Sequence, residues 1–234
     1  MFMVGVAKSS SAIGNIAMAF ICFYILRHWS AEYHWNGLFL LVAILAVVML
    51  LSSIRFAESP AWLITHARSE EAERAVRYFL GSDVTIGDVG TRSAHEVSLK
   101  AMFRGDNLRR VILSGVPWAC EGFGVYGVGV FLPILIMAMG LGKDTEGVKH
   151  IASVVELSGY VNISVAAGFI VGLALIQRLY HVRQQAVGFI LSGIGLALLI
   201  VAYRMHLGAW VMLCGLIIFE LFLNCGPHLI TFIL

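Results

Sequence analysis

Long, almost uncharged apolar stretches recur along this chain. The clearest is the unbroken apolar run from Leu38 to Leu51. A helix needs about 20 mostly apolar residues to cross the hydrocarbon core of a bilayer, because that core is ~30 Å thick and a helix rises ~1.5 Å per residue. Lipid offers no hydrogen-bond partners to the backbone, so each stretch of that length is expected to be helical.

The composition excludes an ordinary soluble domain. Hydrophobic residues make up 59% of the chain and charged residues only 13%, whereas soluble domains carry roughly 25% charged residues. We therefore predict an all-α, multi-spanning membrane helix bundle with six spans. The predicted spans, to within a few residues, are Val4–Leu26, Asn36–Ile54, Val111–Gly140, Ile151–Gln177, Gln185–Tyr203 and Gly208–Leu234.

Basic residues are concentrated in the polar stretch Arg55–Arg110, which holds nine of the sixteen in the chain. Arg178 and Arg183 lie between the fourth and fifth spans, and Lys8 lies near the start of the first. Because cytoplasmic loops carry an excess of Lys and Arg, these segments and both chain ends are expected on the cytoplasmic side of the cell membrane. The predicted organisation is two spans, a cytoplasmic linker and four spans, in residues 1–54, 55–110 and 111–234.

The linker contains one amphipathic segment. Ser69 is followed by three glutamates within four residues, which is typical of a helix start because acidic side chains stabilise the positive end of the helix dipole. Apolar residues then recur at helical spacing from Ala72 to Leu80. We predict a helix at the membrane surface; a small soluble domain is the alternative, and about 55 residues disfavour a compact independent core.

The cysteines predict packing rather than chemistry. All four lie within apolar stretches and none forms a C-x-x-C pair: Cys22, Cys120, Cys214 and Cys225. We interpret them as small hydrophobic residues, and expect no disulfide, metal site or cofactor. Lys8 and the serines after it interrupt the first apolar stretch, which does not match a cleavable signal peptide.

Polar residues inside the spans carry the functional information, because a carboxylate at the centre of a membrane helix costs at least ~2.5 kcal/mol. Glu121 lies about 16 Å from the cytoplasmic end of the third span, and Glu220 about 18 Å from the external end of the sixth. Asn15 and Asn162 lie at similar depths. Secondary transporters hold substrate and coupling ion near this midplane. The alternative is a set of structural hydrogen bonds between helices.

Two further groups are candidates to line a cavity. Asn224 and His228 are four residues apart, hence on one helical face, with a Gly-Pro pair between them that is expected to kink the helix. Trp118 and Tyr126 are eight apart in the third span, roughly one face. Either group could instead be a packing cluster. No nucleophile–base motif, phosphate loop or metal-ligand cluster predicts an enzyme.

Three segments together resemble the major facilitator superfamily. The segment Ala57–Leu63 resembles the P-E-S-P-R-W-L signature that follows the sixth helix of sugar-porter-like members, with Ala57 in place of Pro and Ala61 in place of Arg. The segment Gln177–Arg183 resembles the D-R-x-G-R-R loop between helices eight and nine. The segment Asn224–Phe232 resembles N-x-G-P-N-x-x-T-F in helix ten of the phosphate:proton symporter branch.

The resemblance extends to the third span. In the phosphate branch, helix seven carries W-x-x-x-D-x-x-x-Y; Trp118 and Tyr126 match its ends, whereas Gly122 stands at the acid position and Glu121 one residue earlier. The resemblance implies that this chain corresponds to helices five to ten of a twelve-helix fold that works by rocking two six-helix halves about a central site. It also implies that the remaining helices are missing partners and that this chain does not transport alone.

We therefore predict a fragment of a proton-coupled secondary transporter for a small polar solute such as a sugar, an organic acid or phosphate. Its expected partners are the lipid bilayer, the solute, protons and the missing helices, with no nucleic acid. One alternative is a non-transporting membrane protein or defective fragment. Another is an intramembrane enzyme, which would require His228 within hydrogen-bond reach of a glutamate.

Overall fold

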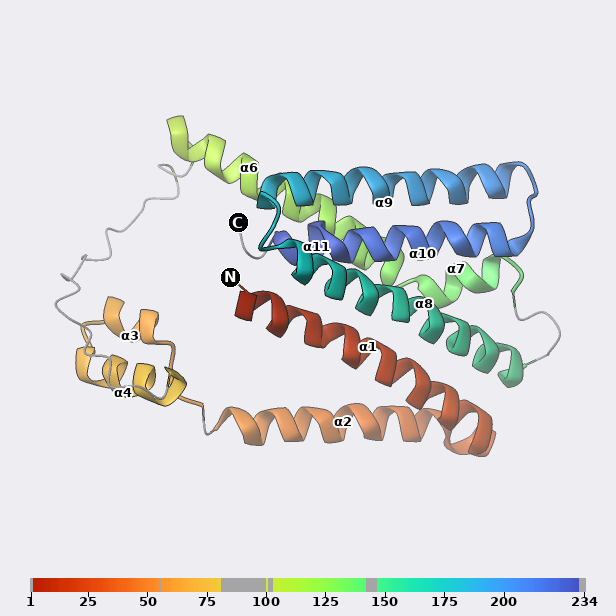
Figure 1. The fold of residues 1–234 in the computed structure, drawn as a ribbon. Helices are drawn as coiled ribbons and strands as arrows, with labels where there is room; N and C mark the ends of the chain where they lie inside the picture. The colour runs from red at the N-terminus through yellow and green to blue at the C-terminus, as the bar shows by residue number, and fades with distance from the viewer. Residues whose placement is uncertain (1, 55, 81–99, 101–102, 142–146, 232–234) are drawn as a thin grey trace. The chain divides into compact units, whose positions relative to one another are not determined.

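The computed structural model describes residues 2–54, 56–80, 100, 103–141 and 147–231, and every regular element in these ranges is a helix (Figure 1). Six helical segments there are long and apolar enough to cross a membrane. They are Gly5–His28, His34–Ser53, Gly105–Gly129, Val148–Leu175, His181–Arg204 and Ala209–Ile230. The prediction of an all-α protein with six candidate spans is confirmed. Parts of two predicted segments, 81–99 of the linker and 232–234 of the sixth span, lie outside the described residues.

The chain forms two compact units. The smaller unit is Phe39–Val111, and the larger one combines Met1–Leu38 with Ile112–Leu234. The smaller unit contains most of α2 (His34–Ser53), followed by α3 (Pro60–Thr65) and α4 (Ser69–Leu80). The apolar side chains of α2 are largely exposed, as expected of a helix that faces lipid.

Helices α3 and α4 pack on each other through small side chains. Leu63 of α3 is buried against Ala72 and Ala75 of α4. The predicted amphipathic helix is present as α4, whereas α3 was not predicted from the sequence. Helix α3 starts at Pro60, a residue that fits the first helical position because its missing N–H has no helical partner there in any case.

An exposed ion pair lies at the N-terminus of α4, between Arg68 and Glu71. Arg68 donates from Nε to Glu71 Oε1 at 2.8 Å and from Nη2 to Glu71 Oε2 at 2.6 Å. These hydrogen bonds lower the pKa of the Glu71 carboxyl. Both side chains are close to half exposed, so we expect the pair to contribute little to stability.

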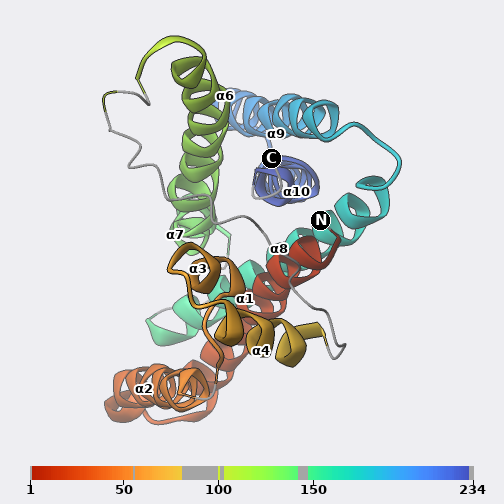
Figure 2. The ribbon, with the colours of Figure 1, turned by 90° about the vertical axis from the view of Figure 1, so that its left-hand side faces the viewer.

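The larger unit is built around α10 (Ala209–Cys225). Helix α10 packs along α9 (His181–Arg204) and α8 (Val148–Leu175), and α1 (Phe2–His28) packs along α8. Figure 2, in which α10 is seen nearly end-on, shows α10 beside α8 and α9. One buried cluster joins Ala12 of α1 to α8 and the end of the sixth span. A second joins α7, α8 and α10.

Glycines let α9 and α10 approach to backbone contact. A Cβ at Gly195 would lie 2.6 Å from the backbone N of Phe219 and 2.8 Å from the carbonyl O of Gly215. A Cβ at Gly215 would in turn lie 2.9 Å from the carbonyl O of Gly195. Small residues permit such close helix packing in membranes. By contrast, a Cβ at Gly193 would meet no atom within 4 Å.

The third predicted span, Val111–Gly140, consists of several helical segments. Helix α6 (Gly105–Gly122) passes into the π-helical segment η2 (Phe123–Gly129), and α7 (Leu132–Ala138) begins after a short turn. Pro133 occupies the first turn of α7, where its missing N–H leaves no helical hydrogen bond unmade. π-helical turns are rare and occur frequently at functional sites.

The sixth span is also divided, as the Gly-Pro pair predicted. Helix α10 ends at Cys225 and α11 (Pro227–Ile230) follows. Gln184 of α9 compensates for the break: its Nε2 donates to the carbonyl O of Cys225 at 2.8 Å and to that of Gly172 in α8 at 3.0 Å. Backbone carbonyls freed within a membrane need such partners.

Candidate functional site

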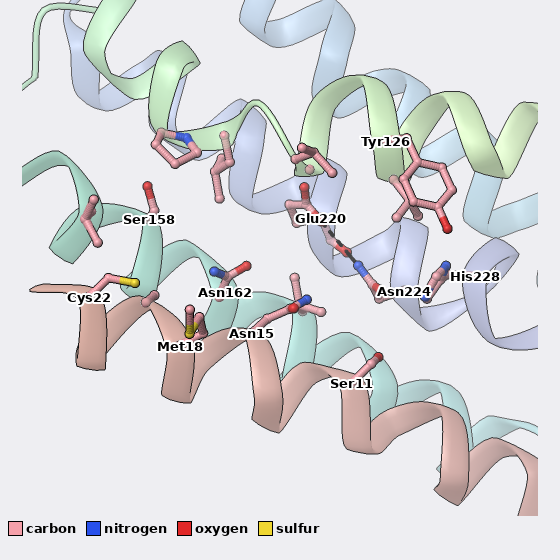
Figure 3. Close-up of a pocket in the computed structure, with 18 residues that line it drawn as sticks. Ser11, Asn15, Met18, Cys22, Tyr126, Ser158, Asn162, Glu220, Asn224 and His228 are labelled. Atoms are coloured by element: carbon pink, nitrogen blue, oxygen red, sulfur yellow. Dashed lines mark hydrogen bonds between the residues drawn. The ribbon is translucent and has the colours of Figure 1, made fainter. Parts of the chain in front are cut away.

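A cavity of about 480 Å³ lies inside the larger unit, bordered by α1, η2, α7, α8, α10 and α11 (Figure 3). Its walls are mixed, with apolar residues such as Leu132 and Val165 beside neutral polar ones. The polar and titratable side chains in its lining are Ser11, Asn15, Cys22, Tyr126, Ser158, Asn162, Glu220, Asn224 and His228.

Helical spacing explains which residues of α1 and α8 reach the cavity. Ser11, Asn15, Met18 and Cys22 are three or four residues apart and lie on one face of α1, which Figure 3 shows turned toward the cavity. Ser158 and Asn162 are four apart on α8 and share a face in the same way.

The structure brings five of the seven candidate site residues into the lining of this one cavity: Tyr126, Asn162, Glu220, Asn224 and His228. Glu121 is outside the lining but bonds to His228, which belongs to it. Trp118 is outside the lining, and 57% of its surface is exposed.

Glu220 and Asn224 form a local pair on α10. Asn224 Nδ2 donates to the carbonyl O of Glu220 at 2.7 Å and to Glu220 Oε2 at 3.3 Å. Both side chains are buried, at 4% exposure each. The second carboxylate oxygen, Glu220 Oε1, is buried and accepts no hydrogen bond from any described residue. Oε1 faces the end of η2, where a Cβ at Gly129 would lie 3.5 Å from it.

Glu121 and His228 form a second pair, between α6 and α11. His228 Nδ1 and Glu121 Oε1 are hydrogen-bonded, and Glu121 is 3% exposed. The ring of Phe169 covers the imidazole edge-on, with centroids 5.6 Å apart. Lys8 of α1 interacts electrostatically with Glu121. The pair therefore lies at a junction of α1, α6, α8 and α11.

This pair was missed by reasoning from sequence. The enzyme alternative required a glutamate within hydrogen-bond reach of His228; the structure supplies one, Glu121, whereas Glu220 on the same span is the one that spacing places about 12 Å away. The serines of the lining were also missed. The recurrence of Ser11, Asn15 and Cys22 at helical spacing was the available signal.

Among the described residues, no group of three or more His, Cys, Asp or Glu side chains is arranged to hold a metal ion. The arrangement provides one buried carboxylate, one imidazole and several amides and hydroxyls in the cavity lining, and a second buried carboxylate, that of Glu121, bonds to the imidazole from outside the lining. Such a site can bind a small polar molecule and exchange a proton, by hydrogen bonds that an apolar surrounding strengthens.

Comparison with known proteins identifies a transporter family. The model described as "Sugar (and other) transporter" matches residues 1–234, the whole chain. The inner membrane metabolite transport protein YgcS of Escherichia coli is 26% identical over 67% of this chain and 33% of its own length. The niacin transporter NiaP of Acinetobacter baylyi is 25% identical over 78% of this chain and 40% of its own length.

The chain therefore spans about a third to two fifths of the length of these two relatives. No solved structure is significantly similar to it.

Proposed function

Because the chain belongs to the sugar (and other) transporter family, we propose that it forms the central part of a proton-coupled secondary transporter for a small polar solute. The observation that carries the proposal is the cavity of mixed lining with a buried carboxylate inside an apolar helix bundle. A buried carboxylate is costly in a membrane, so it marks a solute or proton pathway. A multi-pass location in the cytoplasmic membrane, with the linker in the cytoplasm, is part of this proposal.

The family motifs support a placement as helices five to ten of a twelve-helix transporter. In this placement, residues 1–54 end the first half, 55–110 form the linker and 111–234 begin the second half. Helix α1 then belongs to the first half and α8 to the second, and these two helices pack along each other. Their contact is where rocking of the halves would open the cavity to one side and then the other.

The side chains divide into two proposed roles. Glu220, with Asn162, Asn224 and Tyr126 around it, contacts the solute. Glu121 and His228 exchange the coupling proton, because their hydrogen bond joins a carboxylate to an imidazole. Protonation of either partner changes the strength of that bond. Sugars, organic acids and phosphate are the solute classes proposed from the family resemblance.

The first test concerns the gene, and its result determines which protein the second test uses. Sequencing the DNA on both sides of this reading frame should show four more spans upstream and two downstream. The restored protein, reconstituted in liposomes, should then accumulate one of five labelled solutes (glucose, succinate, nicotinate, phosphate or a small organic amine) when an inward proton gradient is imposed. A protonophore should abolish that accumulation.

The competing reading is a membrane protein that does not transport. Start and stop signals that bound these 234 residues, with no partner frame nearby, would favour it. Uptake by the restored protein that is the same with and without the proton gradient would instead retain transport and contradict proton coupling.

A further inference from the structure

The lining of the cavity contains an acidic side chain without a basic Lys or Arg among its described residues. Of the described residues in its lining, Glu220 is the carboxylate, His228 the imidazole, and none is Lys or Arg. The other polar liners are neutral amides, hydroxyls and a thiol. A solute anion entering this part of the cavity would meet a carboxylate with no cation beside it in the lining. Like charges brought together in this way oppose binding.

The imidazole does not offset that charge. His228 is hydrogen-bonded to Glu121, so any positive charge on its ring is already matched by a carboxylate. Lys8 acts electrostatically on Glu121 and is outside the lining. The imidazole of the described lining is thus bonded to Glu121, and Glu220 remains as the acidic group of the lining itself.

Glu220 presents one oxygen that lacks a partner. Asn224 engages Oε2 and the backbone carbonyl, while Oε1 is buried and accepts no hydrogen bond from the described residues. Leaving a buried acceptor unsatisfied is costly, and more so for a charged group. Such groups are uncommon in native structures and call for an explanation. A hydrogen-bond donor on the solute would supply the missing partner.

We propose that Glu220 binds the cationic nitrogen of the solute, so that the solute class is small organic amines that are protonated at neutral pH. The N–H of the ammonium group donates to Oε1, and Asn15 and Asn162 across the cavity contact the polar remainder. This inference rests on the proposed function, because it assumes that the cavity is the solute site.

The test uses one ring with three head groups. The probes are 3-(aminomethyl)pyridine, 3-pyridinemethanol and nicotinate, which are a cation, a neutral molecule and an anion at about pH 7. Each is titrated by calorimetry into the purified protein in lipid nanodiscs. We expect the amine to bind at least about tenfold more tightly than the alcohol, a factor that corresponds to 1.4 kcal/mol. Nicotinate should bind more weakly than both.

Two variants separate the charge of Glu220 from its position. Glu220→Gln keeps the volume of the side chain and removes the charge, and should bring the amine and the alcohol within about threefold of each other. Glu156→Gln makes the same change on α8, outside the cavity lining, and should leave the preference intact. Preference for nicotinate, or an amine preference that survives Glu220→Gln, would overturn the assignment. Unfolding curves of both variants show whether each is folded.

Cys22 distinguishes failure of this inference from failure of the proposed function. It lines the cavity, so in a variant that keeps only this cysteine it should react with water-soluble iodoacetamide. If it reacts but the amine is not preferred, only the solute class is wrong. If it does not react and no probe binds, the cavity is not a solute site, and both proposals fail.

Discussion

Substituting Gly195 by alanine tests the packing of the larger unit, because the site depends on where α10 lies. The added Cβ would lie 2.6 Å from the backbone N of Phe219 and 2.8 Å from the carbonyl O of Gly215. Ordinary carbon contacts are about 3.5–4.0 Å, and both neighbours are backbone atoms that cannot rotate away. Helix α10 must therefore move by roughly 1 Å, and overpacking of this kind costs about 1–3 kcal/mol.

The matched control is Gly193→Ala, two residues away on the same helix. A Cβ there meets nothing within 4 Å, so only backbone propensity changes. Alanine is favoured over glycine in helices by up to about 1 kcal/mol. The free energy of unfolding is measured in mixed micelles by titrating sodium dodecyl sulfate and following helical circular dichroism.

We expect Gly195→Ala to lose about 1–3 kcal/mol of unfolding free energy and Gly193→Ala to lose none. Equal losses in both variants would show that glycine matters here for backbone flexibility rather than for close approach. A neutral Gly195→Ala would show that α9 and α10 are not in backbone contact.

Three further predictions use the same unfolding assay. Glu121→Gln and His228→Gln should each cost about 3–5 kcal/mol by breaking a buried pair, and the double variant less than the sum; additive losses would deny the contact. Gln184→Met should cost about 1–2 kcal/mol, because the Cys225 carbonyl loses the amide donor of Gln184 and the Gly172 carbonyl keeps only the N–H of Ile176; an unchanged variant would contradict this role of Gln184. Arg68 lowers the pKa of Glu71. The small stabilisation of α4 by this pair should therefore be complete above the ordinary carboxyl pKa of about 4.3, and it should be lost as the pH falls through the lowered pKa. Equal pH profiles of unfolding free energy for Arg68→Gln and the parent protein would contradict this prediction.

The spans could be predicted because their signal is length and apolarity alone. Helix α4 could be predicted because its polar and apolar faces differ, as a surface helix requires. It was harder to predict which face of each span packs against another helix. A membrane helix can be apolar on all sides, and because lipid tails are apolar too, hydrophobicity does not distinguish the packed face from the lipid-facing one. The contact of Glu121 with His228 depends on such rotations.

The π-helical segment explains why spacing failed in the third span. Trp118 and Tyr126 were expected on one face from their separation of eight residues. Residues Phe123–Gly129 are π-helical, with hydrogen bonds that skip one residue more than in an α-helix. The rotation of about 100° per residue in an α-helix therefore does not apply between Trp118 and Tyr126. Tyr126 lines the cavity and Trp118 does not.

The bridge made by Gln184 has a mechanical consequence. One amide group holds backbone atoms of α8 and of the end of α10 to α9, and glycine contacts hold α9 against α10 along their length. We expect α8, α9 and α10 to move together as one rigid body. Spin labels on α8 and α10 should keep a constant distance through the transport cycle, while labels on α1 and α8 should report two distances. The cavity would then open by the swing of one wall, with the other wall fixed.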